Sequence, residues 1–387
     1  MRHSLTLAVA SMAVTGFAQA GIFTSGNLIV ERVGDGTTAL SSAATSVAVL
    51  EYAKTGGSAV QTINMPTSGS NQVTDSGSAT SNGYLNVYNG YVGVSGYNAA
   101  SGTASVASSN TKVGTVLNND GSTASRTLFP TSGTMPFAGN NFRSVIATGA
   151  NTFYASGTSS GSPVTGGLWY ADNGNFTQIN SIATGQPTNM RNVEIYGGNL
   201  YTSSAATTGY GVWQVGTGLA TTGNQTSTLV INAGSGASTY GFVMFDTNSD
   251  GAMDLAYLAD DRTTAGGGLE KWTLSGGTWT QSWALLVNSS GALSGTAGTG
   301  FAGLRGLTGT WDAVNGAQLF ATTTETSNNR LISIIDAGGS TPTTASLIDA
   351  AGTNYAFRGV DVYAAVPAPG SVALVGLAGL LARRRRA

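Results

Sequence analysis

The sequence contains no cysteine, and its only histidine is His3, near the start of the chain. Without cysteine there are no disulfides, thiolate metal ligands or thiol nucleophiles. The lack of any later histidine excludes Ser-His-Asp and Cys-His catalysis and histidine-ligated zinc, and it removes the usual general base near neutral pH. The chemistry that remains uses paired carboxylates, a Tyr or Lys side chain, or a hard metal bound by oxygen atoms.

Charged side chains are also scarce. They make up 9% of the residues, against roughly 25% in ordinary soluble domains, and Gly, Ser, Thr and Asn take their place. When the five arginines at the chain ends (Arg2 and Arg383–Arg386) are left out, 11 basic and 18 acidic residues remain, a net charge of about −7. Because nucleic acids are bound by basic surfaces, this balance argues against a nucleic-acid partner.

The apolar run near the C-terminus is too short to be a comfortable membrane anchor. Gly370 to Ala382 is 13 residues, about 20 Å as a helix, against a hydrocarbon core of about 30 Å. Because an arginine cluster directly after such a run resists translocation, we expect the sequence before it to lie outside the cytoplasm. The four arginines of this cluster are Arg383, Arg384, Arg385 and Arg386.

The N-terminus has the three parts of a secretory signal peptide. Met1 to Ser4 form a small basic region, Leu5 to Val14 are apolar, and Ala18-Gln19-Ala20 is a small-residue cleavage site before Gly21. The sequence therefore predicts an export signal at 1–20, with Ala18 and Ala20 as the small residues of its cleavage site, and an exported body.

The order of export signal, body, Pro-rich motif, short apolar helix and Arg cluster resembles the PEP-CTERM class of bacterial surface proteins. The resemblance covers Val366 to Ala387, and the Pro-Glu-Pro that names the class reads Pro367-Ala368-Pro369 here. It implies that an exosortase-type enzyme recognises and cuts the tail in the inner membrane. The protein would be tethered by its C-terminal helix before processing and then reach the cell surface or extracellular matrix. The alternative is a low-complexity tail that is apolar and then basic.

The body, residues 21–365, is predicted to be β structure. Short runs rich in Val, Ile, Tyr, Phe, Trp and Thr alternate with Gly, Asn, Asp and Ser turns, without sustained helical periodicity. One hairpin is nearly explicit, because Asn89-Gly90 separates Tyr84–Tyr88 from Tyr91–Ser95 and suits a turn in which both residues have positive φ. The alternative is a disordered Gly/Ser-rich stalk.

The apolar segments recur in units of about fifty residues, which favours a propeller or solenoid. Four units begin with an apolar residue followed by Arg. A fifth unit, near Phe242, has the same order of strands but lacks the Arg. The four openings are Phe142-Arg143-Ser144-Val145, Met190-Arg191-Asn192-Val193, Leu304-Arg305-Gly306-Leu307 and Phe357-Arg358-Gly359-Val360.

The last unit, Phe357 to Tyr363, contains only a first strand, while the strand at 26–34 lacks a partner. A propeller closes by completing one blade from both termini, which removes exposed edges. We therefore predict a single β-propeller of six or seven four-stranded blades between a signal helix and a short C-terminal transmembrane helix. The repeats resemble an uncharacterised group of exported bacterial propeller-like proteins, a resemblance that implies no activity.

The repeated arginines are candidate binding residues. First strands line the channel of a propeller, so Arg143, Arg191, Arg305 and Arg358 are expected near one end of it. Guanidinium groups gathered there could hold an anion such as a uronate or phosphate. The alternative is a structural role, in which each Arg bonds a carbonyl or carboxylate of the neighbouring blade; the carboxylates available include Asp361, Glu194 and Asp312.

One segment has the spacing of a calcium loop. In the stretch from Asp246 to Asp254, oxygen ligands stand at positions one, three, five and nine, with Gly251 at six. Position twelve is Tyr257, whereas an EF-hand needs Glu, so the loop looks like the calcium hairpins of integrin-type propellers. The alternative is an Asx-rich turn without metal. The ligands predicted for Ca²⁺ are Asp246, Asn248, Asp250, the Ala252 carbonyl and Asp254.

The tryptophans are more ambiguous. Exposed on one face, they could stack on sugar rings; at repeated strand positions, they would instead pack between blades. They are Trp169, Trp213, Trp272, Trp279, Trp283 and Trp311.

Three classes of function remain. The first is a non-enzymatic surface or biofilm-matrix protein that binds polysaccharide, protein or mineral. The second is a Ca²⁺-dependent propeller hydrolase or lyase acting on an extracellular polymer or lactone. The third is an inert filler of an exopolysaccharide sheath. We prefer the first over an enzyme because the chain lacks the usual catalytic residues, while the low charge and hydroxyl-rich composition favours the third.

Overall fold

The computed structural model describes residues 21–109 and 111–365, and this part of the chain is all-β. Its one helical segment is a short 3₁₀ turn, η1 (Val106–Ser108). None of the described helices is long and apolar enough to cross a membrane.

The two predicted targeting segments lie outside the described residues. They are the signal peptide at 1–20 and the tail at 366–387. The predictions made for their residues therefore stay predictions. In the signal peptide these residues are Ala18 and Ala20, and in the tail they are Pro367, Ala368, Pro369, Arg383, Arg384, Arg385 and Arg386.

Most strands fall into antiparallel groups of four, numbered here as units. Unit 1 contains β27 (Ala356–Val362), β1 (Leu28–Val33), β2 (Ala44–Tyr52) and β3 (Gln61–Asn64). Unit 2 contains β5 (Tyr84–Tyr88), β6 (Tyr91–Tyr97), β7 (Lys112–Leu117) and β8 (Thr123–Leu128). Unit 3 contains β9 (Phe142–Gly149), β10 (Thr152–Gly157), β11 (Gly167–Asp172) and β12 (Asn175–Gln178).

The second half of the chain repeats this plan. Unit 4 contains β13 (Val193–Tyr196), β14 (Asn199–Ala206), β15 (Gly209–Val215) and β16 (Ser227–Asn232). Unit 5 contains β17 (Thr239–Phe245), β18 (Leu255–Asp260), β19 (Gly268–Ser275) and β20 (Thr278–Asn288), with β21 (Leu293–Ser294) and β22 (Phe301–Ala302) added at its edge. Unit 6 contains β23 (Leu304–Asp312), β24 (Gly316–Thr323), β25 (Arg330–Asp336) and β26 (Ser346–Ala350).

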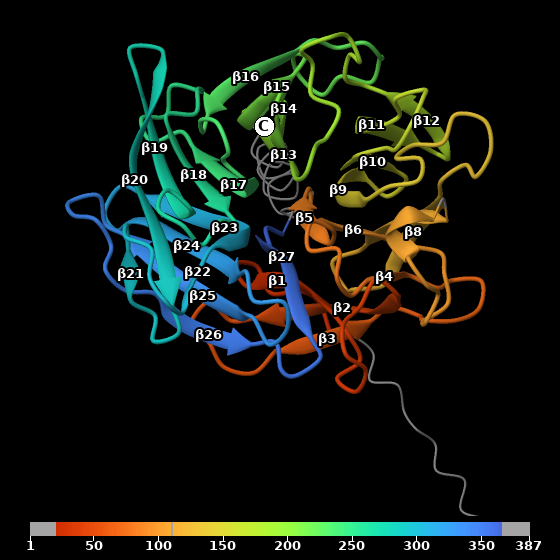
Figure 1. Ribbon diagram of the computed structural model, residues 1–387, viewed down its shortest axis with the longest axis horizontal. Coiled ribbons are helices and arrows are strands. Elements are labelled where there is room, and N and C mark those ends of the chain that lie inside the picture. The colour runs from red at the N-terminus through yellow and green to blue at the C-terminus, as the bar shows by residue number, and fades with distance from the viewer. Residues whose placement is uncertain (1–20, 110, 366–387) are drawn as a thin grey trace, which may run out of the picture.

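The units lie around a common centre, with the first strand of each unit innermost (Figure 1). Inner strands of neighbouring units are in contact. The pairs are β27 with β5, β5 with β9, β9 with β13, β17 with β23, and β23 with β27. Units 1, 2 and 3 are also joined in one hydrogen-bonded sheet, through β4 (Thr74–Ser76) and the parallel pair β5 and β9. The centre is therefore lined by strands from every part of the chain.

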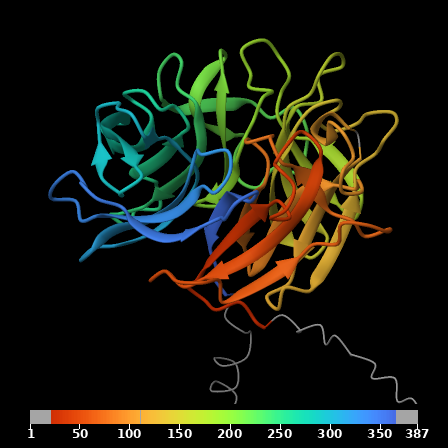
Figure 2. The same cartoon turned by 60° about the horizontal axis from the view of Figure 1, so that its bottom comes forward.

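The first and last described strands belong to the same unit. β1 pairs antiparallel with β27, from Leu28 opposite Val362 to Val33 opposite Ala356. Figure 2 shows the blue β27 running beside the red strands of unit 1. The expectation that the last unit would supply a single inner strand for the N-terminal strands is confirmed by this pairing.

The hairpin expected at Asn89-Gly90 is also confirmed. β5 and β6 pair across it, and both turn residues have positive φ, 50° for Asn89 and 75° for Gly90. The loop from Asp246 to Asp254 joins the paired antiparallel strands β17 and β18, as its comparison with a hairpin implied.

Apolar side chains fill the space between neighbouring units. One cluster joins Ile146 and Leu168 of unit 3 to Val193 and Leu200 of unit 4, all with 1% exposure or less. Similar clusters join unit 4 to unit 5, unit 5 to unit 6 and unit 6 to unit 1. Burial of these faces is the main favourable term for the arrangement.

Glycine lets the inner strands approach closely. A Cβ on Gly359 of β27 would lie 2.7 Å from the Leu85 nitrogen and 2.8 Å from the Gly83 carbonyl oxygen of unit 2. A Cβ on Gly306 of β23 would lie 2.4 Å from the Arg358 carbonyl oxygen. Because these neighbours are backbone atoms, only a residue without a Cβ fits.

We expect Gly359→Ala to destabilise the protein by about 1–3 kcal/mol, because β27 must move away from unit 2. Gly339→Ala is the matched control, since a Cβ there meets nothing within 4 Å. Thermal unfolding followed by circular dichroism measures both. Equal melting temperatures for the two variants would contradict the close approach.

Candidate functional site

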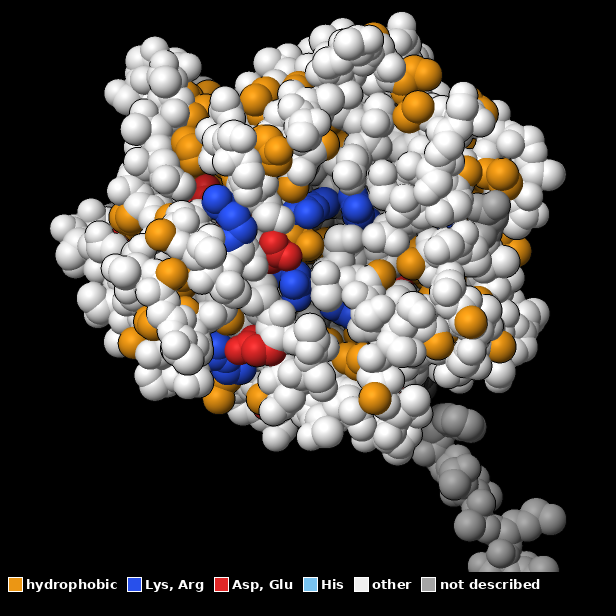
Figure 3. All heavy atoms as spheres, in the orientation of Figure 1, with side chains coloured by type: hydrophobic (Ala, Val, Ile, Leu, Met, Phe, Trp, Pro, Cys, Tyr) orange, Lys and Arg blue, Asp and Glu red, His pale blue; other side chains and the backbone are white. Residues whose placement is uncertain are grey.

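The repeated arginines come together at the centre of the molecule. Arg143 lies on β9, Arg305 on β23 and Arg358 on β27, while Arg191 directly precedes Asn192 and β13. In Figure 3, basic and acidic side chains gather in the middle of the face that the view presents. We call the group formed by Arg143, Arg191, Arg305, Arg358, Tyr84, Tyr240 and Asp261 the axial cluster.

Tyr240 is the hub of the axial cluster. The Arg191 guanidinium carbon lies 3.7 Å from the centre of its ring and the Arg305 carbon 5.7 Å away. The Tyr84 ring is 6.2 Å from the Tyr240 ring. The attraction of each cation to the aromatic ring offsets part of the repulsion between them.

Each arginine is fixed by backbone carbonyls. Arg143 Nη1 donates to the Met190 carbonyl at 2.9 Å, and Arg191 Nη1 donates to the Thr239 carbonyl at 2.9 Å. Met190 directly precedes Arg191 of unit 4, and Thr239 directly precedes Tyr240 of unit 5. In both cases the acceptor is the residue just before the corresponding position of the next unit. Tyr240 therefore takes the place in unit 5 that arginine takes in its neighbours.

The other two arginines follow different patterns. Arg358 Nη2 donates to the Gly77 carbonyl at 2.8 Å, and Arg305 Nη1 donates to the Thr324 carbonyl at 3.0 Å. Arg305 also forms an ion pair of 3.3 Å with Asp261. These contacts are the kind expected if the arginines have a structural role. The three carboxylates considered as partners for that role, however, bond other groups.

Those carboxylates have other partners. Asp361 accepts from the Val87 amide and the Thr308 hydroxyl, Glu194 accepts from Asn192, and Asp312 caps its own turn. None of these three acids bonds an axial arginine in the described chain, and the arginines instead take the other option of the structural alternative, a backbone carbonyl. Their sequence separation gave no information on which acid faces which arginine.

The four arginines differ in accessibility. Arg143 and Arg358 are 6% and 4% exposed, whereas Arg191 and Arg305 are half-buried. Burial, followed by the nearby Arg191 charge, lowers the pKa of Arg143 to about 10. Within the described chain, Arg191 donates only from Nη1. Its Nε and Nη2 groups are therefore left to face solvent or a ligand.

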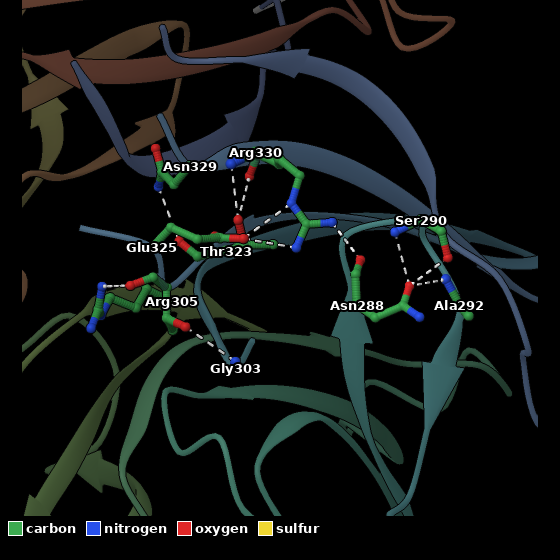
Figure 4. A network of polar contacts seen from close by, with 10 residues as sticks. Asn288, Ser290, Ala292, Gly303, Arg305, Thr323, Glu325, Asn329 and Arg330 are labelled. Carbon is green, nitrogen blue, oxygen red and sulfur yellow. Dashed lines mark hydrogen bonds and ion pairs between the residues drawn. The ribbon is translucent and has the colours of Figure 1, made fainter. Parts of the chain in front are cut away.

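Figure 4 shows how Arg305 is supported. The carbonyl of Thr324 accepts from Arg305, and its hydroxyl accepts from the Gly303 amide. The following loop is held by Arg330, which pairs with Glu325 at 2.8 Å and donates to the Asn288 carbonyl at 2.5 Å. Since Asn288 ends β20 of unit 5, this network ties units 5 and 6 together beside the axial cluster.

Two buried acids lie against Arg358. Glu31 and Asp75 are both fully buried, and desolvation raises the pKa of each: that of Asp75 to about 7, and that of Glu31 well above its ordinary value. The charge of Asp75 adds to the rise at Glu31, and that of Arg358 opposes it. Both Glu31 oxygens lack a hydrogen-bond partner in the described chain.

A second acid pair, Glu194 and Asp361, lines the centre. Burial raises the pKa of Asp361 to about 6, and burial followed by the Asp361 charge raises that of Glu194 well above its ordinary value. The centre of the protein therefore carries both guanidinium groups and carboxyl groups that hold protons more tightly than usual.

The predicted calcium loop connects β17 and β18. Asp246 accepts from the amides of Asp250 and Gly251, at 3.2 and 2.8 Å, and Asp254 accepts from Thr247 at 2.9 Å. Asn248 Oδ1 accepts from the Asp250 amide. No group of three or more Asp, Glu, His or Cys side chains arranged to hold a metal occurs in residues 21–109 and 111–365. The oxygen atoms fit a hard cation chemically, and their observed partners are those of an Asx-rich turn.

The tryptophans divide into two sets. Trp169, Trp213 and Trp272 are buried, as expected for packing residues, and their indole N–H groups donate to protein acceptors. Trp279, Trp283 and Trp311 are only partly buried.

Sequence reasoning missed several residues of the centre. Tyr240 could have been found, because it stands where the other units place arginine. Tyr84 and Asp261 had no comparable signal. Glu31 and Asp75 lie on β1 and β4, outside the inner strands, so no repeat pattern marks them.

The chain matches no protein-family model and no curated protein. Among solved structures, the crystal structure of AofleA from Arthrobotrys oligospora aligns with 90% of this chain and 93% of its own, at 9% identity and a TM-score of 0.31. A TM-score this low carries no argument about fold or function.

The buried acids predict a pH-dependent stability. The pKa of Asp75 is about 7 in the folded protein, against an ordinary 3.8. Between these values the unfolded chain releases the proton and the folded protein holds it, so folding stability falls as pH rises from about 4 to about 7. We expect the melting temperature to drop by a few degrees between pH 5 and pH 8, and Asp75→Asn to reduce the drop.

Asp120→Asn is the control for this experiment. Asp120 is exposed, and hydrogen bonds from Ser122 lower its pKa, so it does not titrate in this window. Differential scanning calorimetry across the pH range measures all three proteins. An unchanged pH dependence in Asp75→Asn would contradict the assignment.

Proposed function

We propose that this protein is a non-enzymatic binding component of the cell surface or extracellular matrix, with the axial cluster as its site for an anionic group of an envelope polymer. The observation that carries the proposal is the pair formed by Arg191 and Arg305 on Tyr240, half-buried at the centre. Uronate carboxylates and phosphate groups are the anions that guanidinium groups recognise best.

The proposed architecture is a six-bladed β-propeller. Its support is the set of six four-stranded units with their first strands innermost, together with the pairing of β1 and β27 in one unit. In such a fold the axial cluster lies at one mouth of the central channel, and different units supply different side chains to it.

The arrangement of the arginines favours an anion. Arg305 pairs with Asp261, and Arg358 lies near Glu31 and Asp75, whereas Arg191 forms no ion pair in the described chain and keeps donors to spare. Burial raises the pKa of Asp75, Glu31, Asp361 and Glu194, which reduces the negative charge that these acids carry at mildly acidic pH. Backbone carbonyls hold the guanidinium groups in place, so little side-chain freedom is lost when a ligand binds.

We expect the protein to bind a polyuronate in low salt, and Arg191→Gln to weaken binding about ten- to a hundredfold, since a hydrogen bond to a charged group contributes about 1.5–3 kcal/mol. Arg32→Gln is the matched control, because Arg32 lies over Tyr355 at 4.1 Å and comes from β1, the second strand of its unit. Isothermal titration calorimetry measures both.

Two results would change the conclusion. Equal affinity of Arg191→Gln and the wild type would remove the axial cluster as the site. Release of shortened polymer chains during the assay would favour the hydrolase or lyase alternative over a binding protein.

The proposed destination rests on the two chain ends. The signal peptide directs export, and the tail that resembles PEP-CTERM sequences directs sorting by an exosortase-type enzyme. The acidic, hydroxyl-rich body between them is suited to an extracellular surface.

Mass spectrometry of the protein isolated from its native cell envelope tests this destination. We expect a mature chain that begins at Gly21 and lacks Arg383, Arg384, Arg385 and Arg386. Recovery of the intact arginine cluster on the surface protein would contradict sorting by tail cleavage.

The loop from Asp246 to Asp254 is the proposed Ca²⁺ site, where the ion would brace the β17–β18 turn. With a dissociation constant of about 10⁻⁴ M, typical of extracellular modules, 10 mM Ca²⁺ would stabilise the fold by about 2.7 kcal/mol. We expect a higher melting temperature with Ca²⁺, reversal by a chelator, and loss of the effect in Asp246→Asn.

Asp35→Asn is the control for the calcium experiment. Asp35 accepts from the Thr37 and Thr38 amides in a similar turn elsewhere in the chain, so this variant should keep the Ca²⁺ response. A melting temperature that does not depend on Ca²⁺ in the wild type would exclude the site.

A further inference from the structure

A pocket opens at the seam between units 4 and 5. Its volume is about 240 Å³, and we call it the seam pocket. Its residues come from β13, β14, β16, β17 and β20 and from the β13–β14 and β17–β18 turns. Arg191 precedes the start of β13, whereas Tyr196 ends that strand, so the pocket lies at the other end of β13 from the axial cluster. The residues that shape it are Tyr196, Asn199, Tyr201, Met244, Met253 and Trp279.

The pocket is built on a firm apolar base. Tyr201 and Met244 belong to a buried cluster shared by units 4 and 5, and Tyr196, Met253 and Trp279 pack against it. The Tyr196 hydroxyl donates to the Phe242 carbonyl at 3.2 Å, which fixes the tilt of its ring. The aromatic walls are therefore held in place by the packing of two units.

The polar atoms of the pocket are not all engaged within the protein. The indole N–H of Trp279 makes no hydrogen bond to the described residues, unlike those of Trp169, Trp213 and Trp272. The same holds for the Tyr201 hydroxyl. Both residues line the pocket, where a ligand hydroxyl could take the place of water.

The amide of Asn199 adds a fixed polar group. Its Nδ2 donates to the Gly197 carbonyl at 3.1 Å and its Oδ1 accepts from the Gly218 amide at 2.8 Å. Each atom keeps capacity for one more hydrogen bond. The pocket thus presents a donor and an acceptor at defined positions beside aromatic faces.

The lining contains no Lys, Arg, Asp or Glu, so nothing in it would pair with a charged ligand. Its volume is below the roughly 300–1,000 Å³ of pockets that enclose drug-sized molecules, which limits it to about one ring. Aromatic faces suit the C–H face of a sugar, and the amide, indole and hydroxyl groups suit its hydroxyls. An apolar ligand would leave these polar groups without partners.

We propose that the seam pocket binds a single neutral pyranose ring, such as a terminal or branching sugar of an extracellular glycan. Trp279 provides the stacking surface, while Asn199 and Tyr201 orient the hydroxyls. This site is independent of the axial cluster, which takes an anionic group.

Isothermal titration calorimetry with a panel of neutral methyl glycosides tests the proposal. We expect at least one glycoside to bind, with affinity reduced tenfold or more by Trp279→Ala and about fivefold by Tyr201→Phe, which removes only the hydroxyl. Trp283→Ala is the matched control, because Trp283 lies on the same strand, β20, outside the pocket. Thermal unfolding of each variant checks that it is folded.

The outcomes separate this site from the axial one. The seam pocket is supported if a neutral sugar still binds to Arg191→Gln but no longer binds to Trp279→Ala. This holds whether or not the protein binds a polyuronate. Absence of binding by every neutral glycoside in the wild type would overturn the proposal, and so would binding that is unchanged in Trp279→Ala.

Discussion

The antiparallel pairing of β1 with β27 is the constraint on which the rest of the structure depends. It joins strands from opposite ends of the described chain, from Leu28 opposite Val362 to Val33 opposite Ala356. Such a contact is costly in chain entropy to form, but it covers edges that would otherwise invite pairing with other chains. It also fixes β27 beside β5 and thereby places Arg358 next to Glu31, Asp75 and the other axial arginines.

Charged residues are rare in this chain, and several of them are buried at its centre, where removing a charge from water costs the most free energy. Burial of Arg143, Arg358, Glu31 and Asp75 at the centre costs solvation free energy that their mutual attraction returns only in part. The burial of apolar clusters between neighbouring units supplies the favourable free energy that offsets this cost. A need for stability therefore does not explain a centre rich in arginine and buried carboxyl groups, which supports the proposed binding role.

Much of the fold could be predicted from the sequence, because each unit repeats a local pattern of apolar runs and turn residues. The Asn89-Gly90 hairpin and the single inner strand at Phe357 follow from such patterns, and so does the meeting of the four arginines at one place. Partners across units could not be predicted. The association of Arg305 with Asp261, and of Glu31 with Asp75, depends on how strands from different units are rotated and staggered. For the same reason, the sequence could not tell that the arginines bond backbone carbonyls and not Asp361, Glu194 or Asp312.

The axial cluster has a consequence for valency. Six units share one centre, so under the proposed function each chain would offer one axial site, however many repeats it contains. A single chain therefore cannot crosslink polymer strands through that site. Retention of a long anionic polymer would require many copies arrayed on one surface, where linked weak contacts raise the overall avidity by orders of magnitude. If the protein has the proposed location and function, the density of molecules at the cell envelope would control how strongly the surface holds its polymer.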